Sequence, residues 1–383
     1  MNNSDNIYIK QWSELNLKDN LLRGIYAYGF EEPSEIQKKA ILPIMQKRDV
    51  IAQAQSGSGK TGTFSISSLQ RVDTSKDYTQ VIILATTHEL AIQIYKVLTS
   101  LGSFIDNLVV KTLIGGTSVQ EDIRQIHNKT PHIVIGTIGR TIDMIKKKII
   151  NVDYLDLLIL DEADEMLSGT FKDNIQSIIQ KCSNETNICV FSATLPDSIL
   201  QLTDKFMNNP YKIIVKKEEL SLECIQQYYI ALENDNDKYN TLKQLFEFLT
   251  VTQCIVFVNG VNRVTDLFDA FSKEGFTVCC MHSNMSKDDR KKTLEDFRRG
   301  NFRLLLSSDL TARGIDVQQV ETVINFDIPR SVHTYLHRIG RGGRWGRKGI
   351  AINLITRRDI NQMRYIENHY KISIKEFQGK LES

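Results

Sequence analysis

The sequence predicts an α/β fold of two similar domains, each a parallel β-sheet with helices on both faces. Three observations support it. At 383 residues the chain exceeds the length at which a single hydrophobic core usually stops growing. Short apolar runs of strand length alternate with helix-length segments, a pattern typical of parallel sheets. The charged stretch Lys216-Lys217-Glu218-Glu219 separates two series of such runs and is typical of a linker.

We expect the first domain to span residues 1–215, the linker residues 216–225 and the second domain residues 226–383. Apolar runs in the first domain predict strands at residues 50–52, 81–85, 108–114, 132–135, 157–160 and 189–191. Those in the second domain predict strands at residues 254–258, 277–281, 303–306, 322–326 and 350–354. The helix-length segments between them supply the crossover connections that parallel neighbours require.

Composition is that of an ordinary globular protein, with 41% hydrophobic and 25% charged residues. The chain has no apolar run of the roughly 20 residues that a membrane span needs. Residues 1–10 are polar and lack the apolar core of a signal peptide. The six cysteines form no Cys-x-x-Cys pair, which predicts a reduced, intracellular protein without a disulfide framework or a zinc site.

The net charge of +2 is too small to identify a nucleic-acid-binding protein, but the basic residues are unevenly distributed. One short stretch near the end of the chain gathers Arg338, Arg341, Arg344, Arg347 and Lys348. The three lysines at residues 146–148 are expected to be only a solvated helix end.

A glycine-rich turn follows the first predicted strand and opens a helix. Backbone N–H groups of such a turn converge on one point, and the helix dipole adds partial positive charge there. Lys60 would reach the β- and γ-phosphates of a nucleotide, and the Thr61 hydroxyl would hold Mg²⁺. The usual pattern begins with glycine where this chain has alanine, so a fortuitous Gly/Ser-rich loop remains an alternative. The candidate phosphate-binding residues are Ala54, Gln55, Ser56, Gly57, Ser58, Gly59, Lys60 and Thr61.

The apolar run at residues 157–160 ends in the acidic sequence Asp161-Glu162-Ala163-Asp164. A carboxylate at the end of a parallel strand suits Asp161 to hold Mg²⁺ in a phosphate-loop ATPase. Glu162 is then suited to orient and deprotonate the attacking water. The alternative is an acidic helix N-terminus; the Gly-Lys-Thr loop upstream favours the catalytic interpretation.

These motifs identify a family. The chain resembles the DEAD-box RNA helicases from about Trp12 to about Ile374, and Asp161 to Asp164 spells the family's name. The similarity is dense at residues 21–37, 215–222, 313–320 and 337–350, and it is closest to the translation-initiation branch and its paralogues. The resemblance implies two RecA-like domains of the P-loop NTPase type, in helicase superfamily 2, that bind ATP and Mg²⁺ and act on RNA.

The family's adenine-reading motif corresponds to residues 29–37, within a longer segment at residues 10–38. The Gln37 amide offers a donor and an acceptor, so it can pair with adenine N6 and N7 together. Trp12 stands where the family keeps an aromatic residue near the adenine. The alternative for Trp12 is a hydrophobic anchor of the N-terminal segment.

Ser192-Ala193-Thr194 follows a predicted strand, and its two hydroxyls suit hydrogen bonding to the acidic cluster at residues 161–164. The resemblance implies that Ser192, Thr194 and His337 couple ATP hydrolysis to strand separation.

The second domain is expected to complete the ATP site, because residues 337–344 match the family's arginine-finger motif. Arg341 and Arg344 would meet the charge that develops on the γ-phosphate; a basic surface patch is the alternative. Gly314 and Asp316 would line the same cleft, with Asp316 at the ribose hydroxyls. Hydrolysis then needs both domains closed on one ATP, and RNA bound across them would favour closure.

The family contacts RNA mostly at phosphates and 2′-hydroxyls, so we expect binding without sequence preference. The candidate RNA-binding residues are His88, Gly116, Thr137, Arg140, Ser307 and Arg313. The chain departs from the family at Thr86, His88, Ile138, Ser283, Asn284 and Lys287, where the family's Pro-Thr-Arg-Glu-Leu, for example, reads Thr-Thr-His-Glu-Leu. His88 replaces a permanent charge with a mostly neutral ring. Lys287 either restores a charge or is simply solvated.

The sequence therefore predicts an ATP-dependent RNA helicase that unwinds or remodels short duplexes during translation initiation. We expect a cytoplasmic monomer that binds no membrane and works with an initiation-factor scaffold protein. The alternative is an ATP-gated RNA clamp of the exon-junction or ribosome-biogenesis type, which would be nuclear. A DNA translocase is disfavoured because the motifs match the RNA branch.

Overall fold

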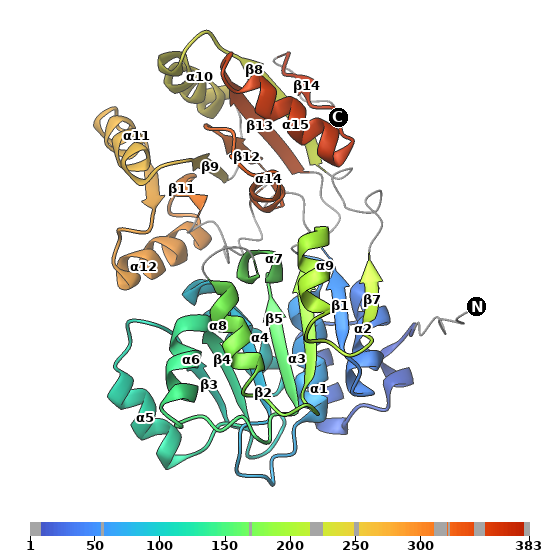
Figure 1. Cartoon of the computed structure of the whole chain (residues 1–383). Helices are drawn as coiled ribbons and strands as arrows, with labels where there is room; N and C mark the ends of the chain where they lie inside the picture. The colour runs from blue at the N-terminus through green and yellow to red at the C-terminus, as the bar shows by residue number, and fades with distance from the viewer. Residues whose placement is uncertain are drawn as a thin grey trace, which may run out of the picture. The chain divides into compact units, whose positions relative to one another are not determined.

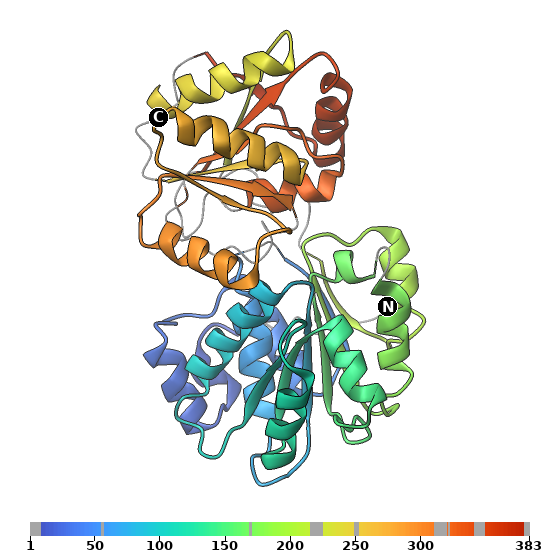
Figure 2. The ribbon, with the colours of Figure 1, turned by 90° about the vertical axis from the view of Figure 1, so that its left-hand side faces the viewer.

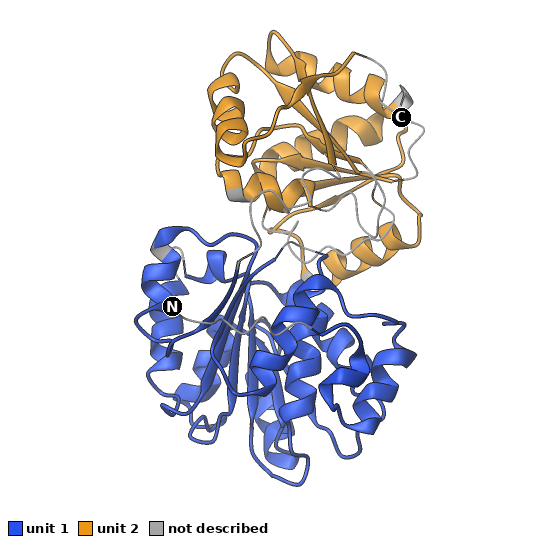
Figure 3. Ribbon diagram, turned by 90° about the vertical axis from the view of Figure 1, so that its right-hand side faces the viewer, with its two compact units in different colours: residues 1–215 blue, residues 216–383 orange. Residues whose placement is uncertain are grey.

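The computed structural model describes residues 9–54, 57–167, 171–214, 225–248, 253–309, 320, 322–340 and 349–378. The chain divides into two compact units, residues 1–215 and 216–383 (Figure 3). The charged residues 216–219 of the expected linker lie outside the described part. Within the described part, no helix combines the length and the apolar character needed to cross a bilayer.

The sheet of unit 1 has seven strands in the order β3-β4-β2-β5-β6-β1-β7, and every neighbouring pair is parallel. The strands are β1 Val50–Gln53, β2 Val81–Ala85, β3 Val110–Leu113, β4 Ile133–Thr137, β5 Leu157–Asp161, β6 Asn187–Ser192 and β7 Tyr211–Ile214. All strands predicted for this domain are present, with ends that shift by a few residues.

Helices cover both faces of this sheet (Figures 1 and 2). They are the 3₁₀ helix η1 Trp12–Leu15 and α1 Asp19–Ala27, α2 Glu35–Met45, α3 Lys60–Arg71, α4 His88–Leu101, α5 Val119–Asn128, α6 Ile138–Lys146, α7 Ala163–Met166, α8 Lys172–Ile179 and α9 Asp197–Thr203. Alternate residues of each strand face opposite helix layers. In β2, Ile83 packs in the core with α1 to α4, and Ile82 packs in the core with α5 to α9. This double burial explains the continuous apolar runs.

Unit 2 repeats the design with the strand order β10-β11-β9-β12-β13-β8-β14, again with parallel neighbours. The strands are β8 Ile225–Ala231, β9 Cys254–Val258, β10 Val278–Met281, β11 Leu304–Ser308, β12 Thr322–Asn325, β13 Gly349–Ile355 and β14 Lys375–Glu376. The five strands predicted from apolar runs are all present, so two α/β domains with parallel sheets are confirmed.

The described helices of unit 2 are α10 Asp235–Phe248, α11 Val261–Lys273, α12 Lys287–Arg298, α14 Val332–Ile339 and α15 Ile360–Tyr370. One face of the sheet packs on α10 and α11, and the other packs on α12. The Tyr370 hydroxyl donates to the Val332 carbonyl at 2.9 Å and joins α15 to α14.

Strand order decides which motifs can meet in unit 1. The carboxyl ends of parallel strands lie at one edge of the sheet, and ligands bind there in open α/β folds. β5, β6 and β1 are consecutive neighbours, and they carry the acidic motif, the Ser-Ala-Thr motif and the glycine-rich turn. β3, β4 and β2 form the other half of the edge and lead into the candidate RNA-binding residues.

Candidate active site

The glycine-rich turn is built where β1 passes into α3. Gly59 is the N-cap of α3 and has φ 101°, a conformation that favours glycine. A Cβ at Gly59 would lie 2.5 Å from Ser34 Oγ, so a side chain would also collide with α2's N-cap. Lys60 begins α3, which places its backbone at the positive end of the helix dipole. Gln55 and Ser56 lie outside the described residues.

The start of α2 is hydrogen-bonded to this turn. The Ser34 hydroxyl donates to the Ser58 carbonyl at 2.8 Å, and Gln37 Nε2 donates to the Gly59 carbonyl at 3.4 Å. The Ser34 N–H donates to Gln37 Oε1 at 2.7 Å as part of a capping box. Each amide atom of Gln37 thus has one protein partner, and it keeps one further lone pair or hydrogen for a ligand.

An aromatic pair lies beside the same turn. The Trp12 ring is 1% exposed, stacks on Phe30 with 6.5 Å between ring centroids, and donates its indole N–H to the Phe30 carbonyl at 3.1 Å. Phe30 in turn reaches the first turn of α3, because a Cβ on Gly62 would lie 3.0 Å from Phe30 Cε2. The sequence interpretation did not select Phe30, although its place inside the adenine-reading motif was a usable signal.

Asp161 is the last residue of β5 and is 3% exposed. Burial raises the pKa of Asp161 to about 7; the positive charge of Lys60 opposes the rise, and the Glu162 and Asp164 carboxylates add to it. A bound divalent cation would favour the ionised carboxylate at this position.

Glu162 occupies an unusual backbone conformation for a residue with a side chain. It is the N-cap of α7 with φ 58° and ψ 48°, in the left-handed region. Its N–H donates to Asp161 Oδ1 at 3.1 Å, and its carboxylate Oε2 accepts from Thr86 Oγ1 at 2.5 Å. Such strain often marks a functional site, because the surrounding contacts must hold it.

The Ser-Ala-Thr motif contacts the last residue of the acidic cluster. Thr194 Oγ1 donates to Asp164 Oδ2 at 2.7 Å, and the Asp164 N–H donates to Ser192 Oγ at 3.3 Å. The Ser192 hydroxyl donates onward to the Thr194 carbonyl at 2.6 Å. The predicted contact between these hydroxyls and the acidic cluster is therefore confirmed.

Candidate RNA-binding residues of unit 1 gather at the ends of β2, β3 and β4. His88 begins α4 after β2, and a Cβ on Gly115, in the turn after β3, would lie 3.3 Å from His88 Nε2. Gly116 has φ 77°, so the turn depends on glycine there. Thr137 ends β4 and is the N-cap of α6.

Arg140 is 8% exposed and bonds within its own unit. Its guanidinium forms an ion pair with Asp122 of α5 and donates to the Thr117 hydroxyl at 2.9 Å and the Thr117 carbonyl at 2.8 Å. The charge is thus directed at the turn that follows Gly116. Arg140 supports this turn from inside, an arrangement that the sequence interpretation did not foresee.

In unit 2 the structure describes only part of the predicted site. Ser307 is fully buried at the end of β11, and His337 lies on α14 with 6% exposure. The other predicted residues of this unit, Arg313, Gly314, Asp316, Arg341 and Arg344, lie outside the described residues.

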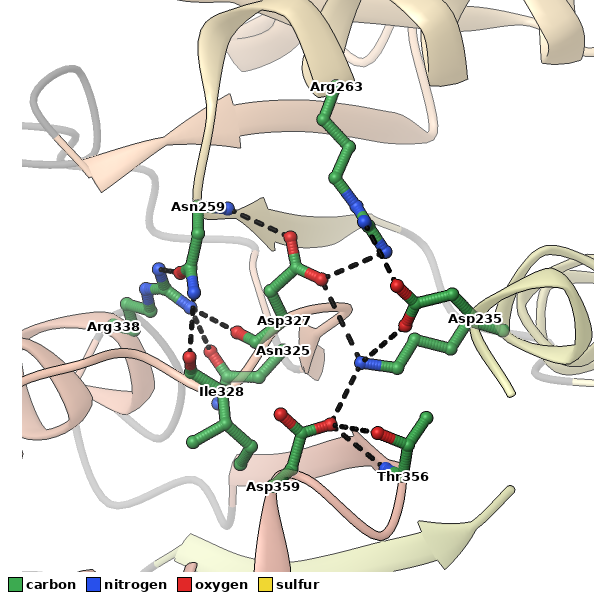
Figure 4. A network of polar contacts seen from close by, with 10 residues as sticks. Asp235, Asn259, Arg263, Asn325, Asp327, Ile328, Arg338, Thr356 and Asp359 are labelled. Atoms are coloured by element: carbon green, nitrogen blue, oxygen red, sulfur yellow. Dashed lines mark hydrogen bonds and ion pairs between the residues drawn. The ribbon is translucent and has the colours of Figure 1, made fainter. Parts of the chain in front are cut away.

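A buried arginine organises the carboxyl edge of the unit 2 sheet (Figure 4). Arg338 on α14 is 1% exposed, and its guanidinium donates to Asp309 Oδ1, to the Asp327 carbonyl at 2.7 Å and to Asn259 Oδ1 at 2.6 Å. These partners follow β11, β12 and β9. Arg338 therefore joins three strand ends to the helix that precedes residues 341–348.

A buried lysine lies beside this network, because it shares Asp327 with it. Lys238 on α10 is 2% exposed, and its Nζ lies 3.2 Å from Asp359, 3.6 Å from Asp235 and 3.8 Å from Asp327. Arg263 adds a second cation at 3.1 Å from Asp327. Opposite charges of this kind are what allow an ammonium group to remain buried.

Comparison with known proteins identifies both units. The family described as DEAD/DEAH box helicase matches residues 34–202, and the helicase conserved C-terminal domain matches residues 237–346. A protein of Scheffersomyces stipitis named "ATP-dependent RNA helicase eIF4A" is 48% identical over 98% of this chain and 94% of its own length. A protein of the same name from Pyricularia oryzae is 49% identical over 96% of this chain and 92% of its own length.

Solved structures of DEAD-box proteins support the same assignment. Dbp5 of S. cerevisiae, bound to RNA and ADP BeF3, matches with a TM-score of 0.89 and 31% identity over 96% of this chain and 95% of that one. Mss116p bound to ssRNA and AMP-PNP matches with a TM-score of 0.87 and 26% identity over 100% of this chain and 81% of that one. The predicted pair of RecA-like domains is confirmed, and the chain belongs to the DEAD-box helicase family.

Proposed function

We propose that this protein is an ATP-dependent RNA helicase that hydrolyses ATP in an RNA-stimulated manner and unwinds or remodels short RNA duplexes. The observation that supports this best is the convergence at one sheet edge of Lys60, the strained Glu162 and the bond from Thr194 to Asp164. A phosphate-binding helix start, a hydrolytic carboxylate and a coupling motif are the parts that such an enzyme needs. Relatives at 48–49% identity carry the corresponding name.

ATP fits the described residues. Gly59 caps the start of α3 in a left-handed conformation, so the first turn of α3 presents backbone N–H groups to the phosphates, and Lys60 supplies a positive charge. The free hydrogen-bonding positions of Gln37 read the adenine edge, and Phe30, backed by the buried Trp12, packs beside the base. Thr61 and Asp161 would hold Mg²⁺ together with phosphate oxygens and water, and the ion would neutralise charge on the phosphates.

Glu162 acts as the general base in this proposal. Its carboxylate orients the attacking water and accepts its proton as the water oxygen bonds to the γ-phosphorus, the bond from that phosphorus to the bridging oxygen breaks, and ADP leaves. Unit 2 contributes Arg341 and Arg344, which stabilise the developing charge, and Gly314 and Asp316, which meet the nucleotide. These four roles follow from the family motif.

RNA is bound through its backbone, without sequence preference. His88, Gly116 and Thr137 contribute from unit 1, and Arg313 contributes from unit 2, where the buried Ser307 takes part through the end of β11. Arg140 takes part indirectly, because it holds the turn after Gly116 through Thr117.

The cellular role we propose is duplex remodelling during cytoplasmic translation initiation, by a monomer that works with a scaffold protein. An ATP-gated RNA clamp, with slow release of RNA, is the second candidate. The departures from the family motifs at Thr86, His88 and Ile138 stand at RNA-facing or coupling positions, where the two candidates differ in their demands. Clamps and helicases share the ATP site and differ in how fast the products leave.

The decisive experiment is steady-state ATP hydrolysis by the full chain with single-stranded RNA, with DNA of the same sequence and without nucleic acid. We expect RNA, but not DNA, to stimulate ATP turnover. Short RNA duplexes should separate only when hydrolysable ATP is present. Equal stimulation by DNA would overturn the assignment to RNA. RNA that stays bound for much longer than one ATP turnover would identify the clamp.

A further inference from the structure

Thr86 and Glu162 lie where the two halves of the unit 1 sheet edge meet. β2 and β5 are neighbouring strands with Leu84 opposite Leu160, and Thr86 follows β2 as Glu162 follows β5. β2 belongs to the half that leads to the proposed RNA contacts, and β5 belongs to the half that carries the ATP chemistry. A bond between these residues therefore bridges the two halves.

The bond itself is short and sheltered. Thr86 Oγ1 donates to Glu162 Oε2 at 2.5 Å, and Glu162 is only 7% exposed. Within the described part of the chain, Thr86 is the hydrogen-bond donor to this carboxylate. The charged groups that act on the adjacent Asp161 are the ammonium of Lys60 and the carboxylates of Glu162 and Asp164.

The Thr86 hydroxyl has no competing structural duty at the start of α4. The N-cap of α4 is Thr87, whose hydroxyl accepts from the Leu90 N–H at 3.2 Å. The family motif carries proline where this chain has Thr86, and proline has no hydroxyl to donate. The bond to Glu162 is therefore a feature of this chain and cannot be inferred from the family pattern.

We propose that Thr86 is a positioning residue that holds the Glu162 carboxylate in the orientation in which it directs the attacking water at ATP. A glutamate side chain has three rotatable bonds, and two neighbouring carboxylates repel this one. A single donor at Oε2 restricts the rotation and leaves Oε1 for the water. Thr86 also lies two residues before His88, so the same short segment carries the hydroxyl and a proposed RNA contact.

This inference rests on the proposed role of Glu162 as the base, and Thr86→Val tests it. Valine keeps the branched shape and removes the hydroxyl. We expect RNA-saturated kcat to fall about tenfold, the scale of one hydrogen bond to a charged group, with KM for ATP changed less than twofold. Thr86→Ser keeps the donor and should restore at least half of the wild-type kcat.

A double-mutant comparison separates positioning from general damage. In a Glu162→Ala background the hydroxyl has no carboxylate to hold, so adding Thr86→Val should change the residual single-turnover rate less than twofold. Thr87→Val is the matched control, because it removes a neighbouring hydroxyl that caps α4. It should lower the melting temperature without producing the same selective loss of kcat.

Each outcome decides the matter. An unchanged or increased kcat in Thr86→Val, equal losses with and without Glu162, or no rescue by serine would overturn the positioning role. Those results would leave the proposed function intact as long as Glu162→Gln abolishes hydrolysis. Full activity of Glu162→Gln would instead refute the base assignment itself.

Discussion

Two adjacent carboxylates at the end of β5 are held in different surroundings, and this difference supports different roles. Asp161 ends the strand in the sheet interior, where burial raises its pKa. Glu162 lies in the left-handed region, and its carboxylate accepts a hydrogen bond from Thr86, which follows the neighbouring strand β2. A bound divalent cation would offset the pKa rise of Asp161, which fits the proposed role of Asp161 in holding the ion, and the hydrogen-bonded Glu162 carboxylate fits the proposed role in orienting water.

Lys60→Ala and Glu162→Gln should separate nucleotide binding from chemistry. In the proposed site Lys60 meets the phosphates in the ground state, so its loss should weaken ATP binding. Glu162 acts on the water, so glutamine should leave ATP and RNA bound while hydrolysis falls by roughly 10² or more. Nucleotide titration and turnover assays on both variants measure this. An equal loss of ATP affinity in the two would contradict the division of roles.

His88→Arg should strengthen the RNA interaction at neutral pH. A neutral imidazole neutralises no phosphate, whereas arginine is charged at all accessible pH. One added phosphate contact should steepen the plot of log K against log salt concentration by about 0.7 for a single strand. RNA titrations with a non-hydrolysable ATP analogue measure both effects, and an unchanged salt slope would mean that His88 does not face the RNA backbone.

At the scale of the elements, the sequence predicted the strands that are buried on both faces and missed strands in which polar and apolar residues are mixed. Strands such as β9 and β5 are continuous apolar runs, because helices cover both faces of each sheet. β8 reads Ile-Gln-Gln-Tyr-Tyr-Ile-Ala and was missed, since polar residues interrupt its pattern. β14 has two residues at the sheet edge and offered no signal.

The hydrogen bonds and ion pairs within the candidate site were harder to predict from the sequence than the identity of the residues that form it. The bond from Thr194 to Asp164 was expected because both belong to family motifs. The bond from Thr86 to Glu162 joins residues 76 positions apart and depends on β2 lying beside β5. Arg140 was expected to face RNA, but its burial depends on a partner carboxylate from α5 that no motif contains.

The buried ammonium of α10 should matter for stability far more than an exposed one on the same helix. Lys238→Ala would remove the buried cation that three aspartates share, leaving Arg263 as the counter-charge for Asp235 and Asp327, and should cost about 3 kcal/mol in the free energy of unfolding. Lys243→Ala is the matched control: its pair with Glu274 is partly exposed, and its loss should cost less than about 1 kcal/mol. Urea denaturation of the full chain compares them, and equal costs would mean that the Lys238 cluster is not coupled to folding.

At the scale of the whole molecule, the site residues are divided unequally between the units. Unit 1 carries the proposed phosphate turn, the acidic motif and the adenine-reading motif, so we expect it to supply the contacts that bind ATP. The expected arginine fingers belong to unit 2, where Arg338 fixes the end of α14 immediately before them. A chain organised in this way can bind ATP with one unit while requiring both for rapid hydrolysis.

Arg341→Ala and Arg344→Ala test that requirement in the full chain. Either change should reduce RNA-stimulated turnover by roughly 10³ or more, the scale of a lost arginine finger, and should alter ATP affinity only slightly because unit 1 supplies the binding contacts. Arg347→Ala is the matched control, since it removes the same charge from the same basic stretch but lies outside the family motif. If these arginines form only a basic surface patch, all three variants should weaken RNA binding alike. The slope of log K against log salt concentration should then become shallower by a similar amount in each. A selective loss of turnover in the first two, with RNA binding preserved, would identify them as the residues that make hydrolysis depend on both units.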